Sequence, residues 1–100
     1  MGVYRLSRKA ASDIEDIYTY TIEQHGLAAA RKYLDGLHSC FELLAEYPML
    51  GRRADRIAPG VRRHEYQAHV VFYVQRKATV RIARVLHARM DVPRRYRRLT

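Results

Sequence analysis

Apolar residues follow two different spacings along the 100-residue chain, and each spacing predicts its own kind of element. A short alternation at Val3–Leu6 predicts a first strand, and apolar side chains then recur every three or four residues as far as Pro48. That second spacing is typical of amphipathic helices, with Ser7 as the expected N-cap of the first helix and Gly26 as the break before the second. So short a connection predicts an antiparallel helical hairpin. The inward residues expected from its second helix are Leu27, Leu34, Leu37 and Phe41.

Beyond a loop rich in Gly, Pro and Arg from Met49 to Gly60, alternation returns. Three runs predict strands: Val61–Tyr66, His69–Gln75 and Thr79–Leu86. In the last run, the residues expected to pack on the helices are Val80, Ile82 and Leu86, and those expected to face the other way are Arg81, Ala83, Val85 and His87. The predicted fold is α+β in the order β-α-α-β-β-β, with the N-terminal strand and the helical hairpin packed on a small, curved antiparallel sheet. We expect a single domain at residues 1–92 and a basic C-terminal tail at residues 93–100.

Basic residues are concentrated in the second half of the chain. The sequence has 19 Lys and Arg against 10 Asp and Glu, a formal net charge of +9. Residues 1–48 hold 5 basic and 7 acidic side chains, whereas residues 49–100 hold 14 basic and 3 acidic ones. Most of the cations are arginines, whose planar guanidinium suits carboxylates and phosphates. The charge favours a surface that binds nucleic acid, anionic lipid or an acidic protein, without deciding among the three.

Two residues of the last predicted strand raise specific expectations. Arg84 falls on its apolar face, where an unpaired guanidinium would be costly, so we expect a buried partner such as Asp13 or Asp16. His87 has two interpretations. It either contacts an acidic group, such as Asp91 or an acid of a partner, or bonds a backbone carbonyl where the strand ends.

Several classes of protein need residues that this sequence lacks. No apolar run is long enough to cross a bilayer and no secretory signal is evident, so we expect a cytoplasmic protein. The lone Cys40 has no partner for an internal disulfide and is expected to pack in the core. The five histidines lack metal-ligand spacing, and neither a Gly-rich phosphate loop nor a nucleophile elbow is present. We therefore expect no metal, no cofactor and no catalytic residue.

Four stretches of the sequence occur in a familiar order: YRLSRKAASDIEDI, AEYPMLGR, HVVFYV and, most specifically, RVLHARMD. Over roughly residues 3–92 the chain resembles the ParE toxins of the RelE/ParE superfamily. The resemblance implies the toxin of a bacterial type II toxin-antitoxin module. It also implies a ParD-like antitoxin, whose disordered C-terminal segment folds along the toxin's helices and basic sheet surface in a hetero-oligomeric complex. DNA gyrase is the implied target, and a block of replication the implied effect.

The sister RelE toxins, which are ribosome-dependent mRNA endonucleases, provide the alternative function. They use basic residues on the second strand, an arginine at the start of the third, a later arginine and a tyrosine near the C-terminus. Arg62 and Arg63 match the first of these features, but the third-strand position falls at the uncharged Val70. Arg89 matches the later arginine loosely, and Tyr96 lies in the basic tail. This pattern favours a toxin that acts by binding and is not an enzyme.

A plain nucleic-acid-binding module is a third hypothesis, because the tail PRRYRRLT mixes cations with an aromatic residue, as single-strand binders do. In the interpretation as a toxin that acts by binding, the basic sheet face and the tail are expected to meet partners. The residues expected there are Arg62, Arg63, Arg81, His87, Arg89, Arg94 and Arg95.

Overall fold

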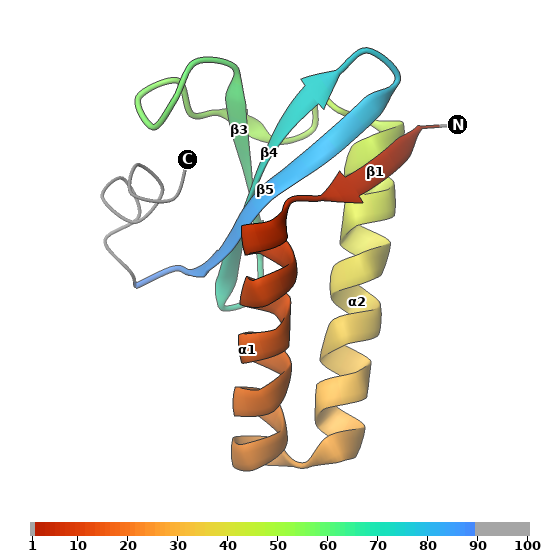
Figure 1. Ribbon diagram of the computed structural model, residues 1–100, viewed down its shortest axis with the longest axis vertical. Helices are drawn as coiled ribbons and strands as arrows, with labels where there is room; N and C mark the ends of the chain where they lie inside the picture. Colours follow the sequence, from red (N-terminus) through yellow and green to blue (C-terminus); the bar gives the residue numbers. More distant parts are fainter. Residues whose placement is uncertain (1, 90–100) are drawn as a thin grey trace.

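The computed structural model describes residues 2–89 and places two helices against one face of a five-stranded sheet (Figure 1). The helices are α1 (Arg8–His25) and α2 (Leu27–Glu46). The strands are β1 (Val3–Leu6), β2 (Arg52–Arg53), β3 (Val61–Tyr66), β4 (His69–Arg76) and β5 (Thr79–His87). This order confirms the predicted α+β class and the helical hairpin, and it adds the two-residue strand β2 inside the predicted loop.

Local signals in the sequence determine where α1 and α2 begin and end. The Ser7 Oγ accepts a hydrogen bond from the Ala10 amide at 3.0 Å, so Ser7 is the N-cap of α1 as predicted. The same Oγ donates to the Ala83 carbonyl at 2.8 Å, which ties the start of α1 to β5. Gly26 separates the two helices with a φ of 92°, a left-handed conformation that glycine adopts at little cost.

The sheet is mixed, because β1 pairs with β5 in the parallel direction. Its strand order is β1-β5-β4-β3-β2, and the other three pairs are antiparallel. The predicted antiparallel sheet is formed by β3, β4 and β5, whereas the parallel direction of the N-terminal strand was not predicted. The connection from β1 to β5 runs through the helical hairpin, β2, β3 and β4, so it is long enough for the crossover that parallel strands require. β1 and β2 are consequently the two edges of the sheet.

A β-bulge between β4 and β5 changes which side chains face the helices. The register shifts between Phe72 and Tyr73 of β4, which leaves Ala83 as an extra residue in β5. Beyond the bulge the alternation reverses, so Val85 packs in the core on the helix side and Leu86 on the opposite face. The predicted directions of these two residues were wrong, because strict alternation assumes an unbroken ladder.

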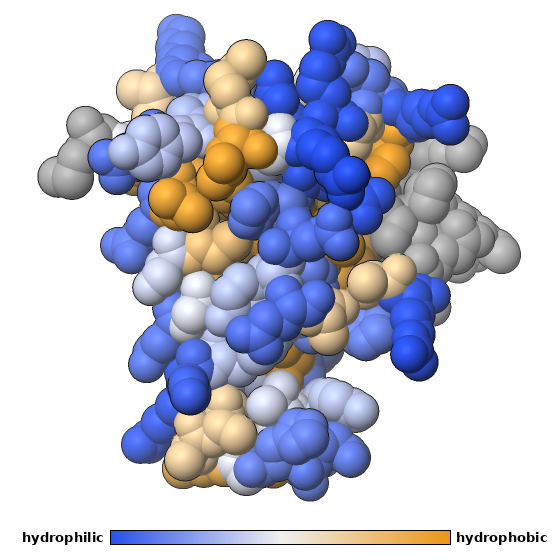
Figure 2. Space-filling view, turned by 180° about the vertical axis from the view of Figure 1, so that it is seen from behind, coloured by the Kyte–Doolittle hydropathy of each residue, from blue (hydrophilic) through white to orange (hydrophobic). Residues whose placement is uncertain are grey.

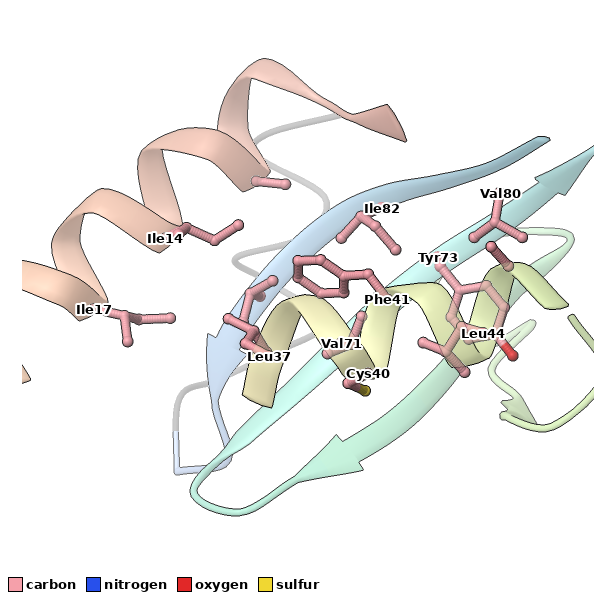
Figure 3. Packing of buried hydrophobic residues seen from close by; sticks show 13 residues of the cluster. Ile14, Ile17, Leu37, Cys40, Phe41, Leu44, Val71, Tyr73, Val80 and Ile82 are labelled. Carbon is pink, nitrogen blue, oxygen red and sulfur yellow. The ribbon is translucent and has the colours of Figure 1, made fainter. Parts of the chain in front are cut away.

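The main core lies between the helices and the sheet (Figure 3). Leu37 and Phe41 of α2 meet Tyr73 of β4 and Ile82 of β5, and all four side chains are fully buried. Cys40 joins the same cluster, as predicted, and burial raises the pKa of its thiol to about 11. The apolar faces of the helices and of the sheet thus pack together in one layer of side chains.

Leu27 is the exception among the residues predicted to face inward from α2. It is 46% exposed, because the helical hairpin extends past the sheet and its turn has no strand to cover it (Figure 1). On the opposite face of the sheet, the loop after β2 packs over a smaller apolar cluster. The buried members of that cluster are Ala54, Val61, Val70, Phe72, Ala83 and Leu86.

Candidate binding surfaces

Arg62 and Arg63 are neighbours on β3 and therefore point to opposite faces of the sheet. On the helix side, the Arg62 guanidinium donates to the Gly51 carbonyl at 2.7 Å and to the Met49 sulfur at 3.4 Å. On the other side, the Arg63 guanidinium lies 5.9 Å from the centre of the Phe72 ring, a cation–π distance. The two arginines predicted to share one partner surface thus belong to two different surfaces.

Arg81 is exposed and faces away from the helices, as predicted. Its direct neighbour across the parallel β1–β5 pair is Arg5. The two residues line an open groove of roughly 950 Å³, here called the β1–β5 groove. The cations that line it are Arg5, Arg8, Arg76, Lys77 and Arg81, and the other lining residues are Leu6, Ser7, Gln75 and Thr79. Sequence reasoning found only Arg81 of these cations, because the groove depends on the pairing of β1 with β5.

His87 lies on the helix side of β5, contrary to its predicted direction, because it follows the bulge at Ala83. Its Nδ1 accepts a hydrogen bond from the Arg89 amide at 3.1 Å. This favours the structural interpretation of His87, with a backbone amide as the partner in place of the predicted carbonyl. Arg89 itself is exposed in the turn that follows β5. The predicted residues Asp91, Arg94, Arg95 and Tyr96 lie outside the described part of the chain.

His69 lies opposite His87, with the two ring centres 5.5 Å apart. The Nδ1 of His69 is 2.6 Å from the Tyr33 hydroxyl of α2. Burial, and secondarily the charge of His87, lowers the pKa of His69 below its ordinary value. Burial also raises the pKa of Tyr33 to about 12. The pair therefore favours a neutral imidazole at position 69 near neutral pH.

Arg84 forms the buried ion pair that the sequence predicted, and its partner is Asp13 of α1. Its Nε and Nη2 donate to the two carboxylate oxygens at 2.8 and 2.6 Å. The Val85 amide donates to the same carboxylate at 3.0 Å. The two side chains are only 8% and 12% exposed, so this pair fastens α1 to β5 and is not a docking site.

A patch of exposed apolar side chains, which was not predicted from the sequence, lies where α2 ends (Figure 2). We call it the α2 apolar patch, and its members are Leu43, Tyr47, Met49 and Leu50, which are 43–69% exposed. The Met49 sulfur contacts Arg62, so a cation borders the patch. The four-residue spacing from Leu43 to Tyr47 was the available signal, but helical periodicity alone does not tell a buried stripe from an uncovered one.

The positions that RelE-like catalysis would use do not converge. Val70 is buried in the smaller apolar cluster, and Arg62 and Arg63 are on opposite faces. Within residues 2–89, no group of three or more His, Cys, Asp and Glu side chains is placed to hold a metal ion. Neither of the two helices in this range is long and apolar enough to span a membrane.

Comparison with solved structures shows the class of fold. The chain is similar to a chain of a structure titled "Chromosomal ParDE TA system from P. aeruginosa", with a TM-score of 0.75 and 22% identity. The match covers 87% of this chain and 96% of that one. At this identity the likeness establishes the α+β fold alone.

Comparison of sequences shows the family. Residues 4–92 match the model of the ParE toxin of the type II toxin-antitoxin system, parDE. Toxin ParE1 of Caulobacter vibrioides is 40% identical over 91 residues, which is 91% of this chain and 94% of that protein. Toxin ParE1 of Mycobacterium tuberculosis is 38% identical over 92 residues, again 91% of this chain and 94% of that protein. The chain therefore belongs to the ParE family and is the toxin of a type II toxin-antitoxin system.

Proposed function

We propose that this toxin inhibits DNA gyrase by binding it, that it is not an enzyme, and that a ParD-like antitoxin neutralises it in a hetero-oligomeric complex. The observation that carries the proposal is the family match, which extends over residues 4–92. A block of gyrase would stop replication, whereas a RelE-type activity would stop translation. The two functions therefore predict different cellular targets.

The arrangement of the basic residues supports binding without RNA cleavage. An endonuclease that works without metal needs several cations around one phosphate and a group that moves a proton. Here Arg62 is engaged with the Gly51 carbonyl, and the third-strand position is the buried Val70. Val70 offers no charge to a scissile phosphate, and Arg62 lies on the opposite face of the sheet from Arg63, so the two arginines do not surround one phosphate.

The α2 apolar patch is the proposed binding site of the antitoxin. A segment that folds on binding must bury apolar surface to offset its loss of conformational entropy. The patch offers exposed Leu and Met side chains, and Arg62 supplies a cation at its border for an acidic residue of the antitoxin. The other predicted partner residues, Arg63, Arg81, His87, Arg89, Arg94 and Arg95, are proposed to face the target or the antitoxin.

A gyrase supercoiling and cleavage assay with the purified toxin, run beside a ribosome-dependent mRNA cleavage assay, tests the function. We expect inhibited supercoiling or accumulated cleaved DNA, with intact mRNA. Cleaved mRNA with unaffected gyrase would overturn the proposal in favour of the RelE-type function. Unaffected gyrase and intact mRNA together would overturn the choice of target.

The antitoxin surface has its own test, in which the toxin is titrated with the antitoxin encoded beside it. The double variant Leu43→Ser/Leu50→Ser should weaken the complex at least about ten-fold, because it removes two apolar anchors. The control is Tyr20→Ser, which removes a 63%-exposed aromatic from α1 and should leave the affinity unchanged. Equal affinities for wild type and double variant would place the antitoxin elsewhere.

A further inference from the structure

The β1–β5 groove concentrates positive charge that the described protein does not neutralise. Five of its nine lining residues are Arg or Lys, and none is Asp or Glu. The ion pairs found within residues 2–89 join Arg52 to Glu65, Arg53 to Asp55 and Arg84 to Asp13, so none involves the groove. The groove therefore has a positive electrostatic potential, which attracts anions.

Two features of the groove work against folding stability. Arg5 and Arg81 are direct cross-strand neighbours, and like charges in that position repel each other. Arg8 and Lys9 occupy the first turn of α1, which contains no acidic residue, although the helix dipole favours anions there. Departures from stabilising patterns are expected where a protein has a function to serve.

The turn between β4 and β5 adds a third such feature. Lys77 has a φ of 51°, a left-handed conformation that Gly or Asn adopts with less strain. This choice of residue places one more cation at the mouth of the groove. Gln67 has a similar φ of 50° in the β3–β4 turn but is not among the lining residues, which makes it a natural control.

The lining residues distinguish among possible anions. Leu6 is the only large apolar residue among them, so the groove lacks the apolar anchors by which an acidic peptide docks. The lining contains no Phe, Tyr, Trp or His on which the bases of a single strand would stack. What it does offer is cations together with the hydroxyl and amide groups of Thr79 and Gln75, which are the usual partners of a nucleic-acid backbone.

We propose that the β1–β5 groove of this toxin binds the phosphate backbone of duplex DNA. Contacts restricted to phosphates give binding that depends steeply on salt and weakly on sequence. None of the residues that line the groove belongs to the α2 apolar patch. The inference therefore does not depend on the α2 apolar patch or on the choice of gyrase as target, although Arg81 is also one of the predicted partner residues.

Fluorescence anisotropy of a labelled 20-base-pair DNA duplex, titrated with purified toxin between roughly 50 and 200 mM salt, tests the proposal. The variant Arg5→Gln/Arg81→Gln should weaken binding at least about ten-fold and lower the slope of log affinity against log salt by ~1.8, as expected for two lost phosphate contacts. The control Arg52→Gln/Arg53→Gln removes the same charge from the opposite edge of the sheet and should change the affinity less than about two-fold. Equal losses in both variants would show attraction to net charge alone and overturn the assignment.

Thermal unfolding separates loss of the site from loss of the fold. Because Arg5→Gln/Arg81→Gln removes a repulsive pair, its Tm should equal or exceed that of the wild type while DNA binding falls. Lys77→Asn should also weaken DNA binding without lowering the Tm, whereas Gln67→Asn should leave DNA binding unchanged. Weaker binding that always accompanies a lower Tm would overturn the proposal.

Competitors complete the experiment. A single-stranded DNA of the same length and a polyglutamate peptide should displace the labelled duplex only at higher concentrations. Equal competition by polyglutamate would overturn the proposal in favour of an acidic protein partner. Tighter binding of duplex RNA than of duplex DNA would overturn it in favour of an RNA ligand.

Discussion

The two edges of the sheet carry arginines in opposite circumstances. At the β2 edge, Arg52 lies 2.7 Å from Glu65 and Arg53 lies 2.7 Å from Asp55, so the protein supplies its own carboxylates. At the β1 edge, the five cations of the β1–β5 groove have no carboxylate among the residues that line it. The net charge of +9 hides this difference, because a sum over the chain counts both kinds of arginine alike. Whether a cation has an internal partner tells more about binding than how many cations there are.

Arg84 is a third kind of cation, because it is buried together with its carboxylate partner. Removing that carboxylate should have the largest effect on the stability of the fold. Asp13→Asn would leave a buried guanidinium without its carboxylate, and we expect a loss of about 3–5 kcal/mol in the free energy of unfolding. Urea denaturation measures this loss. Asp16→Asn, which changes an exposed acid on the same helix, should cost less than about 0.5 kcal/mol. A cost below about 1 kcal/mol for Asp13→Asn would mean that the ion pair is not structural.

The next effect concerns the turn that leads into the β2 edge. The Tyr73 hydroxyl accepts from the Gly51 amide at 2.8 Å and donates to the Pro48 carbonyl at 2.8 Å. Tyr73→Phe leaves both backbone groups without this partner, and we expect a cost of about 1–3 kcal/mol. Hydrogen exchange of the Gly51 amide should become faster in the same variant. Tyr20→Phe is the control, because that hydroxyl belongs to a mostly exposed residue, and unchanged exchange at Gly51 in Tyr73→Phe would refute the prediction.

Smaller changes in stability are expected from single substitutions that compare the β1 edge with the β2 edge directly. Arg5→Gln should raise the free energy of unfolding by a few tenths to about 1 kcal/mol, because it relieves repulsion from Arg81. Arg52→Gln should lower it by no more than about 1 kcal/mol, because it breaks an exposed ion pair. Denaturant midpoints measured at low salt show whether each substitution raises or lowers the free energy of unfolding. If both substitutions destabilised the protein, the β1 edge would not be repulsive, and the contrast between the edges would fail.

The smallest expected effect is a pH dependence that arises from His69. Its pKa in the folded protein is lower than the ordinary 6.5, so the unfolded chain takes up the proton first. Stability should therefore be complete above about pH 6.5 and should fall as the pH drops from there towards the lower pKa of the folded state. Denaturation between pH 8 and pH 5 measures this. The fall should be reduced in His69→Gln and retained in His25→Gln, which changes an exposed histidine; equal falls in both would assign the effect to other groups.

Features of the fold that depend on local chemistry could be predicted from the sequence. The cap at Ser7 and the break at Gly26 follow from residue types that suit those positions. A buried acidic partner for Arg84 follows from the cost of an unpaired buried charge, whereas the choice of Asp13 over Asp16 comes from the structure. The core packing of Cys40 follows from the tendency of a free cysteine to be buried as a small apolar residue.

Features that depend on pairing between distant segments could not be predicted. The bulge at Ala83 reverses the alternation from which the directions of Val85 and Leu86 were predicted, and no Gly or other turn residue in the sequence marks its position. Strand β2 has two residues, too few for a periodicity to appear. Arg5 became part of a candidate site only once its strand was seen to pair with β5. The α2 apolar patch was missed because an uncovered stripe and a covered one have the same spacing.

The parallel pairing of β1 with β5 also constrains when the molecule can assemble during synthesis. Ser7 and Ala83, which hydrogen-bond to each other, lie 76 positions apart, and such distant contacts form late. A ribosome that has made only the helical hairpin has released Arg5 and Arg8 but not the strand that completes the β1–β5 groove. Chains interrupted before β5 should therefore lack this edge of the sheet, so that the groove exists only in polypeptides that have been translated beyond β5.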